Sequence, residues 1–150
     1  MEILKSCAAI ALSLWVGGLT LFVGVVTPIL FRSLSREEAG RTVGLLFPAV
    51  DRWACVWSAV AVISLAATRS LVLEMPVAVM AGLTAYLVWI LNPQIAEQRQ
   101  LLDKPEFQGT VHAEKFRFGF NRLHRLSVRV HAVILFLGWL ALALVPNFLN

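Results

Sequence analysis

This chain of 150 residues is poor in the residue types that most often carry chemistry, with 3 histidines, 2 cysteines and 1 tyrosine. It has no Cys-x-x-Cys pair and no glycine-rich phosphate-binding loop, which excludes the common thiol-redox and P-loop motifs. Cys7 and Cys55 are predicted at opposite ends of their helices, too far apart for a disulfide within one chain. Charged residues make up only 15% of the sequence, against about 25% in soluble domains. No motif therefore assigns a reaction.

Apolar residues, by contrast, are abundant. They make up 59% of the chain, and the mean hydropathy is +0.77. A soluble domain of this size has too much surface to bury such an excess, whereas a lipid bilayer accommodates it. The formal net charge is +4, but the basic residues lie between apolar runs and form no continuous basic face. We therefore expect the lipid bilayer, and no nucleic acid, as the partner.

The apolar residues are grouped into runs that could cross a membrane as helices, which takes about 20 residues each. The predicted spans are residues 7–30, 53–73, 77–91 and 130–145. We predict a single polytopic membrane domain over residues 1–150 with an all-α fold, a four-transmembrane-helix bundle. Glu74 to Pro76 is predicted to form the turn between the second and third spans. Phe47-Pro48 and Asn92-Pro93 are predicted to break helices, because proline disfavours helical geometry in the residue before it.

Basic residues predict the orientation. The connection over residues 32–52 holds four arginines, and the one over residues 94–129 holds seven lysines and arginines, whereas only two basic residues lie on the other side. Lysine and arginine accumulate in cytoplasmic loops. The sequence therefore predicts a multi-pass protein of the bacterial inner membrane, with both termini outside and both basic connections in the cytoplasm.

Both connections are predicted to contain amphipathic cytoplasmic helices. Ser35 and Glu38 have the spacing of a capping box, which predicts a short helix from there to about Leu46. The longer connection carries apolar residues at three-, four- and five-residue spacings among basic ones, which favours a helix on the membrane surface or one that leads into the fourth span. These residues are Phe107, Val111, Phe116, Phe120 and Leu123.

Small residues at helical spacing predict the faces through which the spans pack, because helices in lipid associate by close approach. The predicted faces are Ser13, Gly17, Thr20, Gly24 and Thr27 in the first span; Ala54, Ser58, Ala61 and Leu65 in the second; Ala78, Gly82, Ala85, Trp89 and Asn92 in the third; and Ser127, His131, Ile134, Gly138, Ala141 and Val145 in the fourth.

The candidate ligand-binding residues are Asn92, His124, Ser127 and His131. His131 lies inside the fourth span, and an ionisable residue there indicates function. His124 and Ser127 precede it on the same helix face, and Asn92 ends the third span. In the alternative interpretation, His131 bonds a carbonyl or a neighbouring helix, and His124 lies among the headgroups. A metal or haem role for His124 and His131 is a further alternative, although the other ligands are not visible.

All acidic residues are predicted to lie outside the clearly apolar segments, so no Ser–His–acid arrangement can be argued and no catalytic residue is predicted. We expect a non-enzymatic protein that binds a small ligand or supports transport through a polar pocket on the cytoplasmic side. Two alternatives stay open: an accessory or structural subunit of a larger membrane complex, and a haem- or metal-binding membrane protein or enzyme. We also expect self-association or membership of a larger complex. The cofactor is unknown.

Several short segments together resemble a known family. They are Leu14-Trp15-Val16-Gly17-Gly18, Pro28-Ile29-Leu30-Phe31, Leu46-Phe47-Pro48, Asn92-Pro93 and the segment from Phe120 to Ser127. Their order and spacing resemble the transmembrane protein 205-like family, whose bacterial members carry a domain of unknown function numbered 4149. The resemblance implies a small polytopic membrane domain and no established reaction. In the late motif of that family an asparagine follows the serine by one turn, and here His131 occupies its place.

Overall fold

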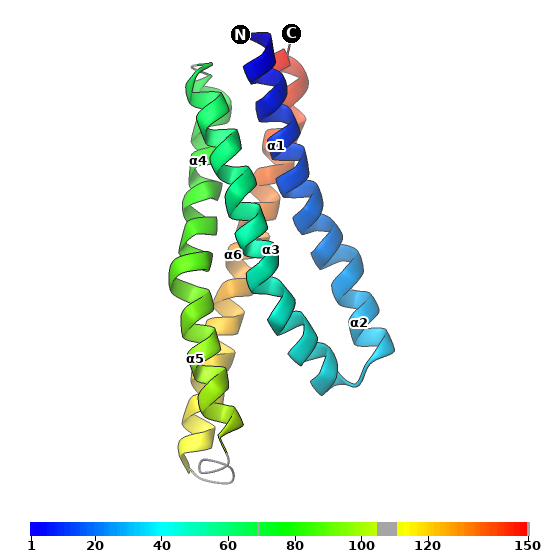
Figure 1. Cartoon of the computed structure of the whole chain (residues 1–150), viewed down its shortest axis with the longest axis vertical. Coiled ribbons are helices and arrows are strands. Elements are labelled where there is room, and N and C mark those ends of the chain that lie inside the picture. Colours follow the sequence, from blue (N-terminus) through cyan, green and yellow to red (C-terminus); the bar gives the residue numbers. More distant parts are fainter. Residues whose placement is uncertain (69, 105–110, 150) are drawn as a thin grey trace.

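The computed structural model describes residues 1–68, 70–104 and 111–149, and in these parts the chain is helical apart from short turns (Figure 1). The helices form four long stretches. The first contains α1 (Glu2–Leu21), the π-helix η1 (Phe22–Val26) and α2 (Thr27–Ser33); the second is α3 (Arg36–Ala66); the third contains α4 (Leu71–Tyr86), the π-helix η2 (Leu87–Leu91) and α5 (Asn92–Asp103); and the fourth is α6 (Val111–Leu149).

Each of the four stretches is long and apolar enough to cross a membrane. The candidate spans are Glu2–Ser33, Arg36–Ala66, Leu71–Asp103 and Glu114–Phe148. The first has 32 residues, so it is about 48 Å long at the α-helical rise, whereas the hydrocarbon core is about 30 Å thick. The chain is thus a multi-pass membrane protein of four candidate spans whose ends extend beyond the hydrocarbon, and the predicted fold class is confirmed.

The predicted boundaries of the spans need correction. The second span was expected over 53–73, but α3 ends at Ala66, and Glu74 to Pro76 lie inside α4 rather than in a turn. The helices also continue through the prolines that were expected to end them, including Pro48 in α3 and Pro146 in α6. Neighbouring helices and local π or 3₁₀ adjustments let membrane helices tolerate proline, so proline was a poor boundary marker.

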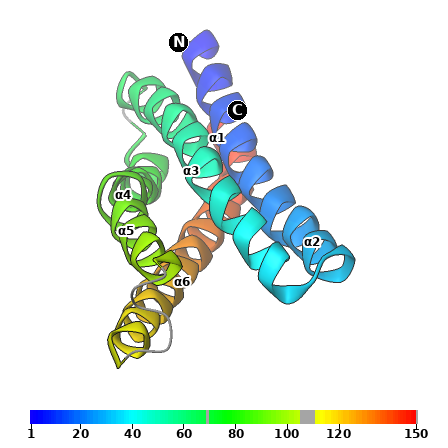
Figure 2. The same cartoon turned by 60° about the horizontal axis from the view of Figure 1, so that its bottom comes forward.

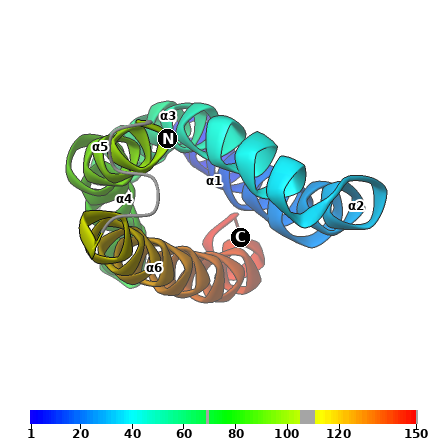
Figure 3. The ribbon, with the colours of Figure 1, turned by 90° about the horizontal axis from the view of Figure 1, so that it is seen from below.

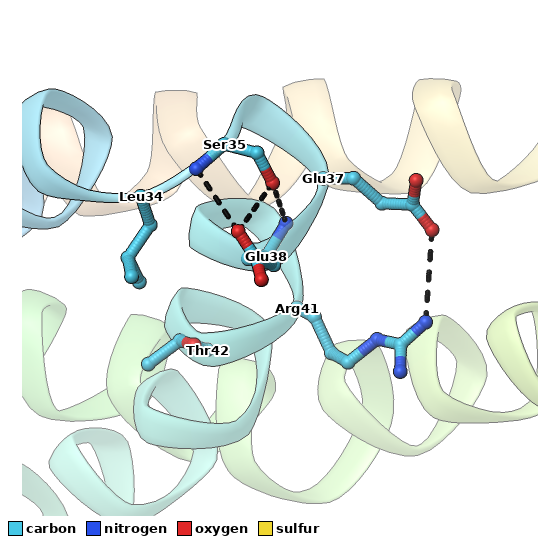
Figure 4. Close-up of a pocket in the computed structure, with 6 residues that line it drawn as sticks. All are labelled: Leu34, Ser35, Glu37, Glu38, Arg41 and Thr42. Carbon is cyan, nitrogen blue, oxygen red and sulfur yellow. Dashed lines mark hydrogen bonds and ion pairs between the residues drawn. The ribbon is translucent and has the colours of Figure 1, made fainter.

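The predicted amphipathic segments are helical, but they continue into the spanning helices. Figure 4 shows the start of α3, where Glu38 N–H donates to Ser35 Oγ at 3.3 Å and Ser35 N–H donates to Glu38 Oε2 at 3.1 Å. This confirms the capping box. The segment then runs on through the whole of α3. The later segment forms the first turns of α6; Phe107 and the side chain of Val111 lie outside the described residues.

The four stretches form a closed bundle at one end and open at the other. Near the chain termini, which lie together, α1 packs against α3 and α6, and α4 packs against the same two helices. Towards the opposite end, α2 packs on α3 and α5 packs on α6. These two pairs diverge, as Figures 1 to 3 show. We call α2 with residues 36–50 of α3 the first arm, and α5 with residues 114–130 of α6 the second arm.

The contact faces of α3 and α6 agree with the prediction, while those of the other two stretches do not. Most of the predicted face residues of the second and fourth spans are buried. In the first span, however, Gly17 and Gly24 are exposed with no atom within 4 Å of an added Cβ. In the third, Gly82 and Trp89 are exposed. Other, mostly larger side chains fill the core instead, namely Ala8, Leu12, Trp15, Val16 and Leu19 of α1 and Leu73, Val77, Met80 and Thr84 of α4.

Two other glycines mark where helices do approach closely. An added Cβ at Gly18 would collide with the indole ring of Trp53, so α1 and α3 meet there through an aromatic ring lying on bare backbone. A Cβ at Gly138 would lie 2.6 Å from Cγ2 of Val16 and 3.1 Å from Cε of Met80. Gly138 therefore brings α1, α4 and α6 together in the closed half of the bundle.

Replacing Gly138 by alanine is expected to destabilise the protein. The added methyl group must displace Val16 and Met80, and overpacking of this kind costs about 1–3 kcal/mol. Gly17→Ala is the matched control, because nothing lies near its Cβ position. The free energy of unfolding of both variants, measured in detergent micelles titrated with a denaturing detergent, checks this. Equal stability of the two variants would contradict the described packing of α6.

Candidate functional site

A buried carboxylate and a buried imidazole meet across the bundle. Asp51 comes from the middle of α3 and His131 from the middle of α6, and Nε2 of His131 lies 2.8 Å from Oδ1 of Asp51. The side chains are only 2% and 5% exposed, respectively. Burying ionisable groups is costly unless they are paired and hydrogen-bonded. This contact is therefore the main polar link between the two helices.

Asn92 completes the contacts of the carboxylate. Its Nδ2 donates to Oδ2 of Asp51 at 2.8 Å. Asn92 follows η2, and its backbone N–H bonds the carbonyl of Leu87, five residues earlier. Pro93 has no N–H to continue the α-helical pattern, and its ring would meet the carbonyl four residues before it. The π turn relieves this clash. Because one π turn spans about five residues, Asn92 lies on the same buried face of the helix as Leu87.

The backbone of α6 fixes the proton on one nitrogen of His131. Nδ1 lies 2.8 Å from the carbonyl oxygen of Ser127, and the Ser127 hydroxyl is 3.4 Å away. A carbonyl oxygen only accepts, so Nδ1 carries a hydrogen and donates it. One further proton then lies between Nε2 and Oδ1 of Asp51. Whether it resides on His131 or on Asp51, the pair has no net charge, which reduces the cost of its burial.

Two phenylalanines cover the pair on the side of the first arm. The Phe47 ring packs edge-on against the His131 imidazole, with centroids 4.9 Å apart, and Phe22 packs edge-on against Phe47 at the same distance. Phe22 is the first residue of η1, which precedes Thr27-Pro28 just as η2 precedes Asn92-Pro93. Both π-helices thus contact or position residues of this cluster, and π turns are frequent at functional sites.

Three of the four predicted site residues come together here, and His124 does not. Asn92, Ser127 and His131 join through Asp51 and the α6 backbone. His124 is exposed two turns before His131, with its ring stacked parallel to Phe120. Within the described part of the chain, no three Cys, His, Asp or Glu side chains gather as a metal-ligand set. The metal alternative therefore has no donor cluster among these residues.

The prediction that acidic residues lie outside the apolar segments was wrong for Asp51. This residue stands beside Arg52, and such a charged pair resembles the edge of a span. A signal was nevertheless present. The predicted contact face of α3 recurs at Ala54, Ser58 and Ala61, and one step backwards along the same spacing falls on Asp51. A face of close approach that includes an acid predicts a buried partner for that acid.

A surface hollow at the turn between α2 and α3 is separate from this cluster (Figure 4). It is lined by exposed groups that already bond one another, including the capping box and an ion pair of 3.6 Å between Arg41 and Glu37. Exposed pairs of this type contribute little free energy. The hollow is part of the start of α3, and the buried cluster is the stronger functional candidate.

Removing one member of the buried pair is expected to be more harmful than removing both. Asp51→Leu or His131→Leu alone leaves an unpaired ionisable group, which costs about 3–5 kcal/mol. The double variant removes the pair together and should recover much of that loss. Unfolding free energies of the two single variants and the double variant, measured in the same micelles, give the coupling. Additive losses would contradict the described contact.

The matched family agrees with the resemblance drawn from the sequence. The model of the domain of unknown function DUF4149 matches residues 10–102 of this chain. The match includes Asp51 and Asn92 and ends before Ser127 and His131. No curated protein and no solved structure matches the chain. Because the match covers more than half of the sequence, this membrane protein belongs to the DUF4149 family.

Proposed function

We propose that this protein is non-enzymatic and supports transport across the bacterial inner membrane, with Asp51 and His131 as the residues that take up and release a proton. The observation that carries the proposal is the buried pair itself, formed by ionisable groups of two spanning helices. Ionisable residues inside a membrane bundle are rare and mark ion pathways and proton relays. With one shared proton the pair is neutral, and gain or loss of a proton leaves one unit of charge.

The shape of the bundle supports access from one side. Between the cluster and the chain termini, the core is filled by fully buried apolar residues such as Leu12, Trp15, Val77 and Met80. On the other side the two arms diverge (Figure 3). A charge on the pair would weaken the link between α3 and α6, because an unpaired charge favours water over an apolar surrounding. Proton exchange would thereby be coupled to movement of the arms.

The orientation belongs to the same proposal. Both termini lie at the closed end of the bundle, and the arms carry most of the basic residues. By the preference of lysine and arginine for the cytoplasm, the arms extend to the cytoplasmic side and the termini face outward. The buried pair would then exchange protons with the cytoplasm in the conformation described.

Reconstituted vesicles test the proton role. Vesicles holding a pH-sensitive dye are given a potassium diffusion potential, and proton uptake is followed by fluorescence. Wild-type protein is expected to exceed protein-free vesicles, while Asp51→Asn and His131→Gln should fall to that background, because each removes one proton-exchanging group. His124→Gln is the matched control on the same helix and should keep wild-type uptake. Full uptake by Asp51→Asn, or wild-type uptake at background, would refute the proposal.

Reporter fusions test the orientation separately. A reporter that is active only outside the cytoplasm should be active when fused to the C-terminus and inactive when inserted after Leu34, in the turn between α2 and α3. The physical reason is the charge asymmetry of the two sides. The reverse pattern of activity would place the arms outside.

A further inference from the structure

A second tier of residues lies next to the buried cluster, towards the arms. Gly44 precedes Asp51 by seven residues on α3, Arg99 follows Asn92 by seven on α5, and His124 precedes His131 by seven on α6. Seven residues are about two helical turns, so each of the three lies on the same helix face as its partner in the cluster.

Arg99 is the central residue of this tier because its side chain bridges the arms. An added Cβ at Gly44 would collide with Nη1 of Arg99, so the guanidinium of α5 lies directly on the backbone of α3. The absence of a side chain at Gly44 creates the space for it. Arg99 is half-buried. The geometry therefore holds a permanent positive charge between the two diverging arms.

No carboxylate neutralises this charge within the described part of the chain. The ion pairs there join Glu2 to Lys5, Glu37 to Arg41 and Asp51 to His131. Both oxygens of Asp51 already bond other side chains. A half-buried guanidinium has lost part of its hydration, and a bound anion would take up its free donors. Arginine suits phosphate in particular, because its planar fork forms two parallel hydrogen bonds to such oxyanions.

We infer that Arg99, lying over Gly44 between the arms, binds a phosphate group, either of a lipid headgroup or of a soluble phosphate compound. The inference rests on the proposed function and adds the class of the transported or regulating ligand. Exposed arginines of the same end, such as Arg36, Arg122 and Arg125, raise the local concentration of anions. The phosphate would occupy the tier directly beside the proton-exchanging pair.

Ligand-dependent thermal unfolding of the delipidated protein in neutral detergent tests the site. The probes are inorganic phosphate, short-chain phosphatidylglycerol, and potassium chloride at matched ionic strength. A saturable rise of the midpoint with phosphatidylglycerol alone would identify a headgroup site, and a rise with both phosphate probes would identify a general phosphate site. Either result supports the inference. If neither phosphate probe gives a saturable rise of the midpoint, the inference is overturned.

Two variants and a control make the assignment specific. Arg99→Gln removes the cation, and Gly44→Ala keeps every charge while displacing the guanidinium; both should abolish the rise. The alanine also favours the helix, so loss of binding in that variant is not explained by unfolding. Arg117→Gln, at an exposed position of α6, should keep the rise. Retained binding in Arg99→Gln, or equal loss in Arg117→Gln, overturns the inference.

The outcomes are separable from those of the proposed function. Phosphate binding together with background proton uptake would leave the anion site standing and refute the proton role. Proton uptake that depends on Asp51, without phosphate binding, would refute only the anion site.

Discussion

The hydrogen bond between Asp51 and His131 is the constraint on which the described architecture depends. It joins residues that are 80 positions apart in the sequence and links α3 to α6. Because both side chains are buried, the contact is stronger than it would be at a surface, and an unpaired member would be correspondingly costly. The remaining contacts at this level, from Asn92, Ser127 and Phe47, all orient one member of this pair.

The site also explains why the bundle has two different halves. Towards the termini the helices are held by close packing, with Gly138 admitting Val16 and Met80 and Gly18 admitting Trp53. Towards the arms, polar and aromatic contacts add to the apolar ones, and the two helix pairs separate (Figure 2). The first half is held by apolar packing, whereas the second combines apolar packing with hydrogen bonds and charge.

The sequence predicted the fold well because long apolar runs of this kind can be accommodated in few structures other than membrane-spanning helices. The four spans, the capping box at Ser35 and the contact faces of α3 and α6 all follow from periodicity and composition. The boundaries did not follow, because proline is compatible with membrane helices whose neighbours compensate for the lost bond. The contact face of α1 was also wrong, because small residues permit close approach but do not require it, and Trp15 and Leu12 occupy the core instead.

The candidate site was only half predictable. His131, Ser127 and Asn92 were found because polar groups within apolar runs are conspicuous, whereas Asp51 was hidden beside Arg52 at what seemed the edge of a span. The tier of Arg99 and Gly44 was beyond sequence reasoning, since it depends on how two helices from different hairpins approach. A glycine that leaves room for an arginine side chain of another helix produces no periodic pattern in the sequence.

The π-helix η2 gives the position of Asn92 an unusual property. A π turn contains about one residue more than an α turn, so this segment has one extra residue immediately before Asn92, which donates to Asp51. Conversion of that segment to regular α-helix would rotate all of α5 by about 100° around its axis. Asn92 would then point away from Asp51, and Arg99 would leave Gly44 in the same step. A single local rewinding would thus disconnect both tiers at once, and it would also press the Pro93 ring against the carbonyl four residues before it.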